Sequence, residues 1–179
     1  LYDNAQLMEA YLVGYQLTKN EDYLTVISQI LEWLKDEMID ENGGFYSSMD
    51  ADSEGVEGKY YVWNPEEIEN VLSETDAKIF NQFYDISKTG NWEGNSIPNI
   101  IMKKSSLSTL LKIPESEISS SLEKSRLAIK EHRKSRIAPG TDDKIIVSWN
   151  GLMISSLAKV SAFLGDKEYF EIADRAVSF

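Results

Sequence analysis

Apolar residues recur at helical spacing along most of the chain, which predicts a mainly α-helical fold. Two long helices are expected near the start of the chain, over 3–19 and 22–39. Two more are expected near its end, over 147–164 and 167–178. Between these pairs the pattern predicts shorter helices, which cover roughly 65–72, 75–84, 106–112 and a longer stretch from 114 onward.

A short β-hairpin is expected between the second and third helices. Residues 45–52 and 59–63 look like two short strands that are joined around Gly55 and Gly58. A further strand is expected over 97–102, whereas the polar segments 85–96 and 137–143 predict loops. The expected fold is therefore helical with a small inserted hairpin.

The two outer pairs of predicted helices repeat one another at an offset of 146 residues. Asn4 opens one helix and Asn20 precedes the next, just as Asn150 opens a helix and Asp166 precedes its successor. Helical hairpins that repeat in this way bury their faces against neighbouring hairpins, in an α-solenoid or a closed α/α toroid. Because the loops at one end of a toroid converge on a central funnel, the polar loops are candidates for a shared site.

Composition narrows the classes of function. The 179 residues include no cysteine, which excludes disulfides and thiolate metal sites and fits a reducing compartment, for which we expect the cytoplasm. A net charge of −12 at pH 7 opposes binding to phosphate backbones. No apolar run reaches the ~18–20 residues that span a bilayer. We therefore expect neither a nucleic acid nor a membrane as partner.

The segment MDADSEGVEGKYYVW, at 49–63, is the first candidate for chemistry. Side chains two apart share one face of a strand, so Asp50, Asp52 and Glu54 would point the same way. Aligned carboxylates repel one another, which raises the pKa of one of them and suits general acid–base catalysis. A hairpin with a charged, water-facing side explains the same pattern without any catalytic role.

The same segment also matches the opening of a calcium-binding EF-hand loop. Position twelve of that loop must be Glu, but here it is Tyr61, and the flanking residues predict strands rather than helices. An EF-hand is therefore excluded, and a different divalent-metal site over 50–57 stays open. No other cofactor is expected, since the single histidine, His132, cannot build a multi-histidine site.

The second candidate is Asn-Trp-Glu-Gly-Asn at 91–95, inside a predicted polar loop. The indole of Trp92 can stack on the apolar face of a sugar ring while Glu93 and Asn95 bind its hydroxyl groups. A tryptophan that anchors a long loop to the core explains the motif equally well.

The third candidate is the Asp-Asp-Lys triplet at 142–144, closely followed by Trp-Asn-Gly at 149–151. Adjacent carboxylates would raise the pKa of one of them, and the lysine would lower it again. Asn150 falls at a predicted helix start, where it can cap free backbone N–H groups, and so does Asn4. Capping is therefore the alternative to ligand binding for both asparagines.

Four segments resemble signatures of the YyaL-like family, whose vertebrate members are called spermatogenesis-associated protein 20. They are LYDNAQL (1–7), GGFYSSMDADSEGVEGKYYVW (43–63), NWEGNSIPN (91–99) and PGTDDKIIVSWNGLM (139–153). The resemblance implies a partial (α/α)6 toroid, similar to six-hairpin glycosidases and N-acylglucosamine 2-epimerases, which forms a single domain over residues 1–179. It also implies that an N-terminal thioredoxin-like domain and the last hairpins lie elsewhere.

Two hypotheses for function follow from the resemblance to carbohydrate-active toroids. A glycosidase-like hydrolase would use a pair of carboxylates on separate loops, drawn from Asp50, Asp52, Asp142 and Asp143. The alternative is a non-catalytic module that binds a sugar or peptide for the thioredoxin-like domain. Epimerase chemistry lacks the histidines that those relatives use.

The motifs also predict a set of ligand-binding residues, and the expected fold predicts a homodimer. Ala138 and Gly140 replace the Arg and His that the family often carries there, which puts one pocket contact in doubt. A partial toroid would leave apolar helix faces uncovered, so a homodimer through them is expected. The ligand-binding candidates are Asp3, Asn4, Glu54, Trp63, Trp92, Glu93, Asn95, Lys144, Trp149 and Asn150.

Overall fold

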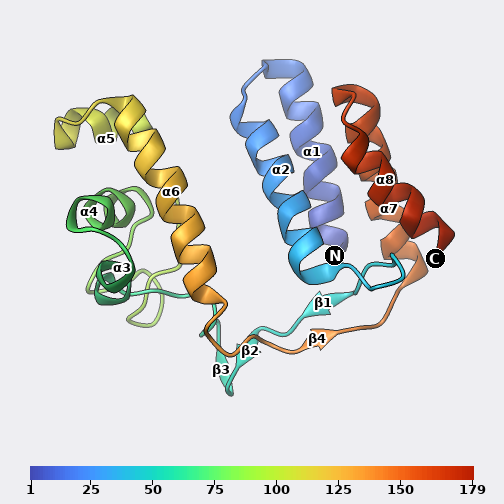
Figure 1. Cartoon of the computed structure of the whole chain (residues 1–179), viewed down its shortest axis with the longest axis horizontal. Helices are drawn as coiled ribbons and strands as arrows, with labels where there is room; N and C mark the ends of the chain where they lie inside the picture. The colour runs from blue at the N-terminus through green and yellow to red at the C-terminus, as the bar shows by residue number, and fades with distance from the viewer. The chain divides into compact units, whose positions relative to one another are not determined.

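The computed structural model describes all 179 residues, and they divide into two compact units (Figure 1). Unit 1 combines Leu1–Asp50 with Thr141–Phe179, and unit 2 is the intervening segment Ala51–Gly140. Eight α-helices dominate, and strands form only two small two-stranded sheets. The prediction of a mainly α fold with a short inserted hairpin is therefore confirmed. The toroid and the single domain stay predictions.

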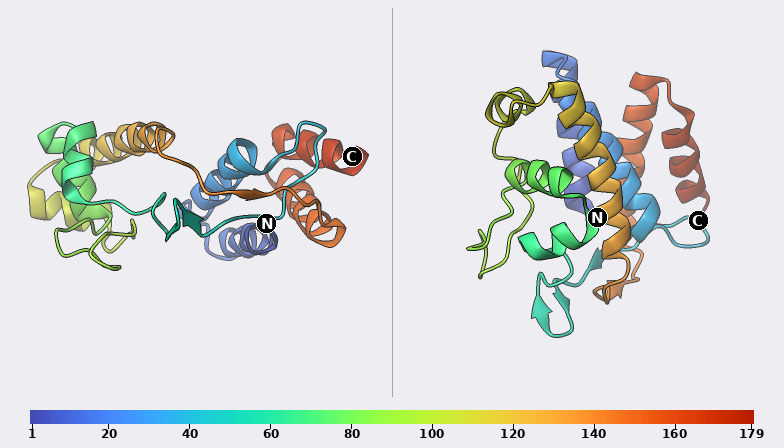
Figure 2. Two further views of the ribbon diagram at one scale, coloured as in Figure 1. Left: turned by 90° about the horizontal axis from the view of Figure 1, so that it is seen from below. Right: turned by 60° about the vertical axis from the view of Figure 1, so that its left-hand side comes forward.

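Unit 1 is a bundle of two helical hairpins. Within each hairpin the two helices pack on one another, and α1 also packs along α7. Figure 2 shows these four helices together from two further sides. The helices are α1 (Tyr2–Thr18), α2 (Asp22–Trp33) with a π-helical turn over Leu34–Met38, α7 (Val147–Leu164) and α8 (Lys167–Ser178).

The two hairpins repeat each other in local detail. After a shift of 146 residues, α7 and α8 begin and end within one residue of α1 and α2. The first helix of each pair ends at a left-handed residue, Lys19 (φ 58°) or Gly165 (φ 73°). Asn20 and Asp166 then each accept a hydrogen bond from the N–H two residues on, at 3.1 and 2.9 Å. The helical repeat predicted from the sequence is present.

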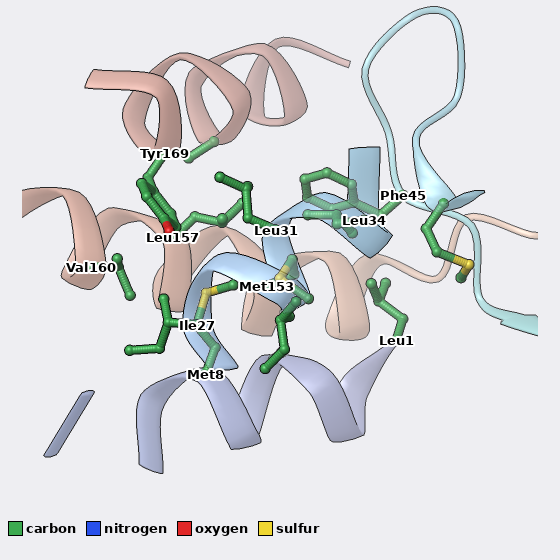
Figure 3. Close-up of a cluster of buried hydrophobic side chains, with 14 of the residues drawn as sticks. Leu1, Met8, Ile27, Leu31, Leu34, Phe45, Met153, Leu157, Val160 and Tyr169 are labelled. Carbon is green, nitrogen blue, oxygen red and sulfur yellow. The ribbon is translucent and has the colours of Figure 1, made fainter. Parts of the chain in front are cut away.

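A hydrophobic core fills the space between the four helices (Figure 3). Each helix contributes from one face, with Met8 from α1, Ile27 from α2, Leu157 from α7 and Tyr169 from α8. Burial of each such side chain contributes roughly 1.5–3 kcal/mol. Burial also raises the pKa of the Tyr169 phenol to about 12, so this phenol stays neutral at physiological pH.

The small sheet of unit 1 joins segments far apart in the sequence. β1 (Ser48–Met49) pairs antiparallel with β4 (Thr141–Asp142), so that Ser48 lies opposite Asp142. The main-chain oxygen of Asp142 also accepts hydrogen bonds from the backbone N–H and the hydroxyl of Ser47, each at 3.1 Å. β4 lies in a segment predicted to be a loop, because a two-residue strand leaves no periodic pattern.

Asn150 fixes the segment after α2 to α7. Its Oδ1 accepts the N–H of Phe45 at 2.8 Å, and its Nδ2 donates to the carbonyl of Phe45 at 2.9 Å. The alternative interpretation, that Asn150 caps its helix, is wrong, since α7 begins at Val147 and contains Asn150. Asn4 likewise lies inside α1 and caps nothing.

We expect Asn150→Ala to lower the free energy of unfolding by about 2–4 kcal/mol, because it leaves the buried N–H and C=O of Phe45 without partners. Urea denaturation measures the loss. The matched control is Asn4→Ala, which removes the same side chain at the equivalent helix position, where it makes no hydrogen bond, and should cost less than about 0.5 kcal/mol. Equal losses in the two variants would contradict the assignment.

Unit 2 packs three helices against α6. Ile129 of α6 lies in one core cluster with Phe80, and Ile118 lies in a second cluster with Leu107. Figure 1 shows α6 running alongside the shorter helices. These helices are α3 (Pro65–Val71), α4 (Glu74–Phe83), α5 (Lys104–Leu111) and α6 (Glu115–Arg133).

The inserted hairpin of unit 2 is shorter than predicted. β2 (Asp52–Ser53) pairs with β3 (Val56–Glu57) around Glu54 and Gly55, whose φ angles of 54° and 74° are those of a type I′ turn. Residues 59–61 form a turn instead of the second strand, and Trp63 forms an isolated β-bridge with Ser96.

The strand predicted over 97–102 is also absent. Pro98 has no N–H to donate to a ladder, and Ile97, Ile100 and Ile101 are exposed instead of packed on a neighbouring strand. The apolar run there therefore reflects an exposed extended segment.

Candidate ligand-binding pocket

A pocket of about 670 Å³ lies wholly within unit 2. Side chains from the β2–β3 hairpin, the turn before α3, the loop at 91–95 and the segment after α6 line it. Its volume falls within the roughly 300–1,000 Å³ of small-molecule sites. The acidic segment and the Asn-Trp-Glu-Gly-Asn loop thus meet at one site. Four predicted ligand-binding residues line it: Glu54, Trp92, Glu93 and Asn95.

Arg136 holds the base of the pocket together. Its Nη1 donates to the carbonyls of Tyr60 (3.1 Å) and Val62 (2.8 Å), and its Nη2 donates to the carboxylate of Glu67 (3.0 Å). The guanidinium carbon lies 3.8 Å from the ring centroid of Trp63, a cation–π contact. Trp63 is only 3% exposed, so it supports the pocket from the core and does not line it.

Glu67 connects this cation to the start of α3. Its Oε2 accepts the N–H of Asn64 at 3.0 Å, and Asn64 Oδ1 accepts the N–H of Glu67 at 2.9 Å, which completes a capping box. The buried Ser53 hydroxyl donates to the carbonyl of Ile137, next to Arg136. The hairpin, the turn and the helix start are therefore all fixed to the segment that follows α6.

Trp92 forms one wall of the pocket. It exchanges backbone hydrogen bonds of 2.9 Å with Asn95 across Glu93 and Gly94, whose φ angles of 47° and 80° again fit a type I′ turn. The indole packs against Gly58, where a Cβ atom would lie 3.0 Å from the ring. A side chain at position 58 would displace the indole. The glycine therefore helps to fix a partly exposed aromatic face.

Asn91 braces the loop that carries this turn. Its amide donates to the Asp85 carboxylate and to the Ile97 carbonyl, both at 3.0 Å, and its oxygen accepts the N–H of Ile97 at 2.8 Å. Ser96 and Trp63 exchange backbone hydrogen bonds of 2.8 and 2.9 Å. The loop is thus bonded to the same tryptophan that supports Arg136.

Charges around the pocket are only partly compensated. Glu54 forms an ion pair with Lys59 at 2.7 Å, and Glu67 forms one with Arg136. Glu57 and Glu93 line the pocket without an ion pair or a side-chain hydrogen bond. The pocket therefore presents two carboxylates that no protein cation balances.

The predicted catalytic carboxylates do not line this pocket. Asp50, Asp142 and Asp143 belong to unit 1, and Asp52 lies on β2 directly opposite Glu57. Lys144 donates to both carboxylate oxygens of Asp142 at 3.0 Å, and this hydrogen bonding holds the pKa of Asp142 below its ordinary value. Because a general acid must carry a proton, Asp142 is unsuited to that role.

The other predicted residues lie in unit 1. Asp3 is exposed in the first turn of α1, and the Trp149 ring lies 4.8 Å from that of Tyr2 between centroids. Asn150 is buried and serves the backbone of Phe45. No group of three or more His, Cys, Asp or Glu side chains, in 50–57 or elsewhere, is arranged to hold a metal ion.

Several residues that line the pocket were not predicted from the sequence, including Lys59, Tyr60, Glu67 and Arg136. One local signal could have linked its two acidic loops. Each contains a Glu-Gly pair between short extended segments, and both pairs form the positive-φ turn of a hairpin.

Fold and site together define a mainly helical protein with a pocket of about 670 Å³ in one of its two units. Over its whole length the chain is homologous to spermatogenesis-associated protein 20. It is 30% identical to the human protein and 29% identical to the mouse protein, in each case over 26% of the relative's length. An uncharacterized protein of Caenorhabditis elegans is 28% identical over 28% of its length. These findings confirm the family resemblance carried by the motifs.

The chain spans about a quarter of the length of these curated relatives. It matches none of the protein-family models against which it was compared. Among its helices, none combines the length and the apolar character needed to cross a membrane.

We expect Arg136→Met to lower the free energy of unfolding by about 2 kcal/mol, because two carbonyls and Glu67 lose their shared donor. Urea unfolding followed by near-ultraviolet circular dichroism measures this loss. The control is Lys134→Met, which removes a cation from an exposed ion pair with Glu131 and should cost less than about 0.5 kcal/mol. A wild-type unfolding curve for Arg136→Met would contradict the role assigned to Arg136.

Proposed function

We propose that this chain binds a carbohydrate in the unit 2 pocket. One observation carries the proposal: the partly exposed indole of Trp92 lies beside the amide of Asn95 and the carboxylates of Glu57 and Glu93, around a single cavity. An aromatic face stacks on the apolar face of a pyranose, and planar polar side chains bind its hydroxyl groups. The combination is the one that sugar recognition requires.

The rigidity of the pocket also favours binding of a small, polar ligand. Trp92 is fixed by a tight turn and by Gly58, and Asn64 is fixed by its capping box. Groups that are already ordered lose little conformational entropy when the ligand arrives. A mono- or disaccharide, which offers many hydroxyls and little apolar surface, gains most from such preorganisation.

Our proposal is for binding without turnover. None of the four carboxylates expected to act in pairs lines this pocket. Asp142 is held ionised by Lys144 and cannot protonate a leaving group. No observation favours glycoside hydrolysis over binding, so the non-catalytic module is the function that the geometry supports better.

We expect Trp92→Ala to weaken sugar binding at least about tenfold, because it removes the stacking surface. Isothermal titration calorimetry of the chain with a panel of hexoses, hexosamines and their disaccharides measures the affinity. Trp92→Phe, which keeps an aromatic face, should retain most of it.

The matched control is Phe170→Ala, which removes an exposed aromatic ring from α8 of unit 1 and should leave affinity unchanged. The same preparation should release no aglycone from aryl glycosides. Equal affinity of the wild type and Trp92→Ala for every sugar that binds, or steady glycoside turnover, would contradict the proposed function.

A further inference from the structure

We propose that the sugar this pocket selects is an amino sugar with a free, protonated amine. The inference rests on the proposed function and adds the chemical class of the sugar. It follows from the balance of charge among the side chains that line the cavity.

The cations of the pocket are already engaged. The Nζ of Lys59 lies 2.7 Å from a carboxylate oxygen of Glu54. The terminal nitrogens of Arg136 donate to main-chain carbonyls and to Glu67. A uronate or a sugar phosphate would therefore have to displace an existing partner before it found a positive charge, and the displaced carboxylate would then be left uncompensated.

Glu57 and Glu93, the other two carboxylates that line the cavity, have no such partner. Glu57 on β3 and Glu93 at the tip of the Trp92 turn reach the cavity from different segments. An ammonium group bound beside either carboxylate would be attracted to it, so a cationic ligand gains more here than a neutral one.

The ring and the amine would use different parts of the site. The indole of Trp92 provides the stacking surface for the pyranose, and Glu57 and Glu93 provide acceptors for an ammonium group. N-acetylation removes the positive charge, so the acetylated sugar should behave like the neutral hexose.

The test compares glucosamine, galactosamine and mannosamine with the corresponding neutral hexoses, with N-acetylglucosamine and with glucuronate, by calorimetry of the whole chain at low ionic strength. At least one amine should bind about tenfold more tightly than its hexose, and this ratio should fall as salt screens the carboxylates. Glucuronate should bind more weakly than glucose. Equal binding of amine and hexose, or a preference for glucuronate, would overturn the inference.

A charge-matched pair of double variants assigns the preference to its residues. In Glu57→Gln/Glu93→Gln the ratio of amine to hexose affinity should fall to about one. In Glu69→Gln/Glu115→Gln, which removes two exposed carboxylates outside the pocket, the ratio should stay at its wild-type value. An unchanged ratio in the first variant, or an equal fall in both, would overturn the inference.

The two proposals fail in different ways. If no sugar binds, the proposed function is wrong, and the choice of amino sugar falls with it. If hexoses and hexosamines bind alike and Trp92→Ala weakens both, sugar binding is supported and only the selection of the amine is overturned.

Discussion

Unit 2 depends on one cation held between an aromatic ring and main-chain carbonyls. Arg136 stacks on the buried ring of Trp63, donates to the turn that follows the hairpin, and forms an ion pair with the glutamate that caps α3. Trp63 in turn shares backbone hydrogen bonds with Ser96, at the end of the Trp92 loop. Because every wall of the pocket is bonded to this centre directly or through one neighbour, its geometry is set before any ligand arrives.

In unit 1 the side chain of Asn150 has the corresponding role, because it holds the main chain of a distant segment in place. Asn150 binds both the N–H and the C=O of Phe45, as a neighbouring strand would, although no strand is present there. The bundle around it is built from two hairpins whose helices match in length to within one residue, and both have a left-handed residue after the first helix and a polar side chain before the second. The two hairpins of unit 1 are therefore formed by the same kinds of helix-end residues, repeated along the chain. Hydrogen bonds such as those of Asn150 then join segments that are far apart in the sequence.

The helices could be predicted from the sequence because amphipathic spacing and helix-end residues act over only a few positions. The β1–β4 ladder could not, since each of its two-residue strands is fixed by a partner more than ninety residues away. Asn150 was misinterpreted for a related reason, because its hydrogen-bond partner Phe45 lies 105 residues away and leaves no local signal.

The residues of the candidate site were likewise only partly predictable from the sequence. Trp92, Glu93 and Asn95 were predicted from a local motif of aromatic and polar residues, and they line the pocket. Arg136 carries no local signal, because its partners Tyr60, Val62 and Glu67 are brought to it only by the fold. Local composition can therefore indicate which residues would touch a ligand, but it does not identify the residue that organises them.

The most direct test of sugar binding in unit 2 is a titration of the chain with the amino sugars and hexoses, followed through the indole N–H signals in NMR spectra. The four tryptophans provide a separate reporter for each part of the molecule. Sugar binding in the pocket predicts a large, saturable shift of the Trp92 signal, with Trp33 and Trp149 of unit 1 unchanged. A static Trp92 signal throughout the titration, or shifts confined to Trp33 and Trp149, would contradict it.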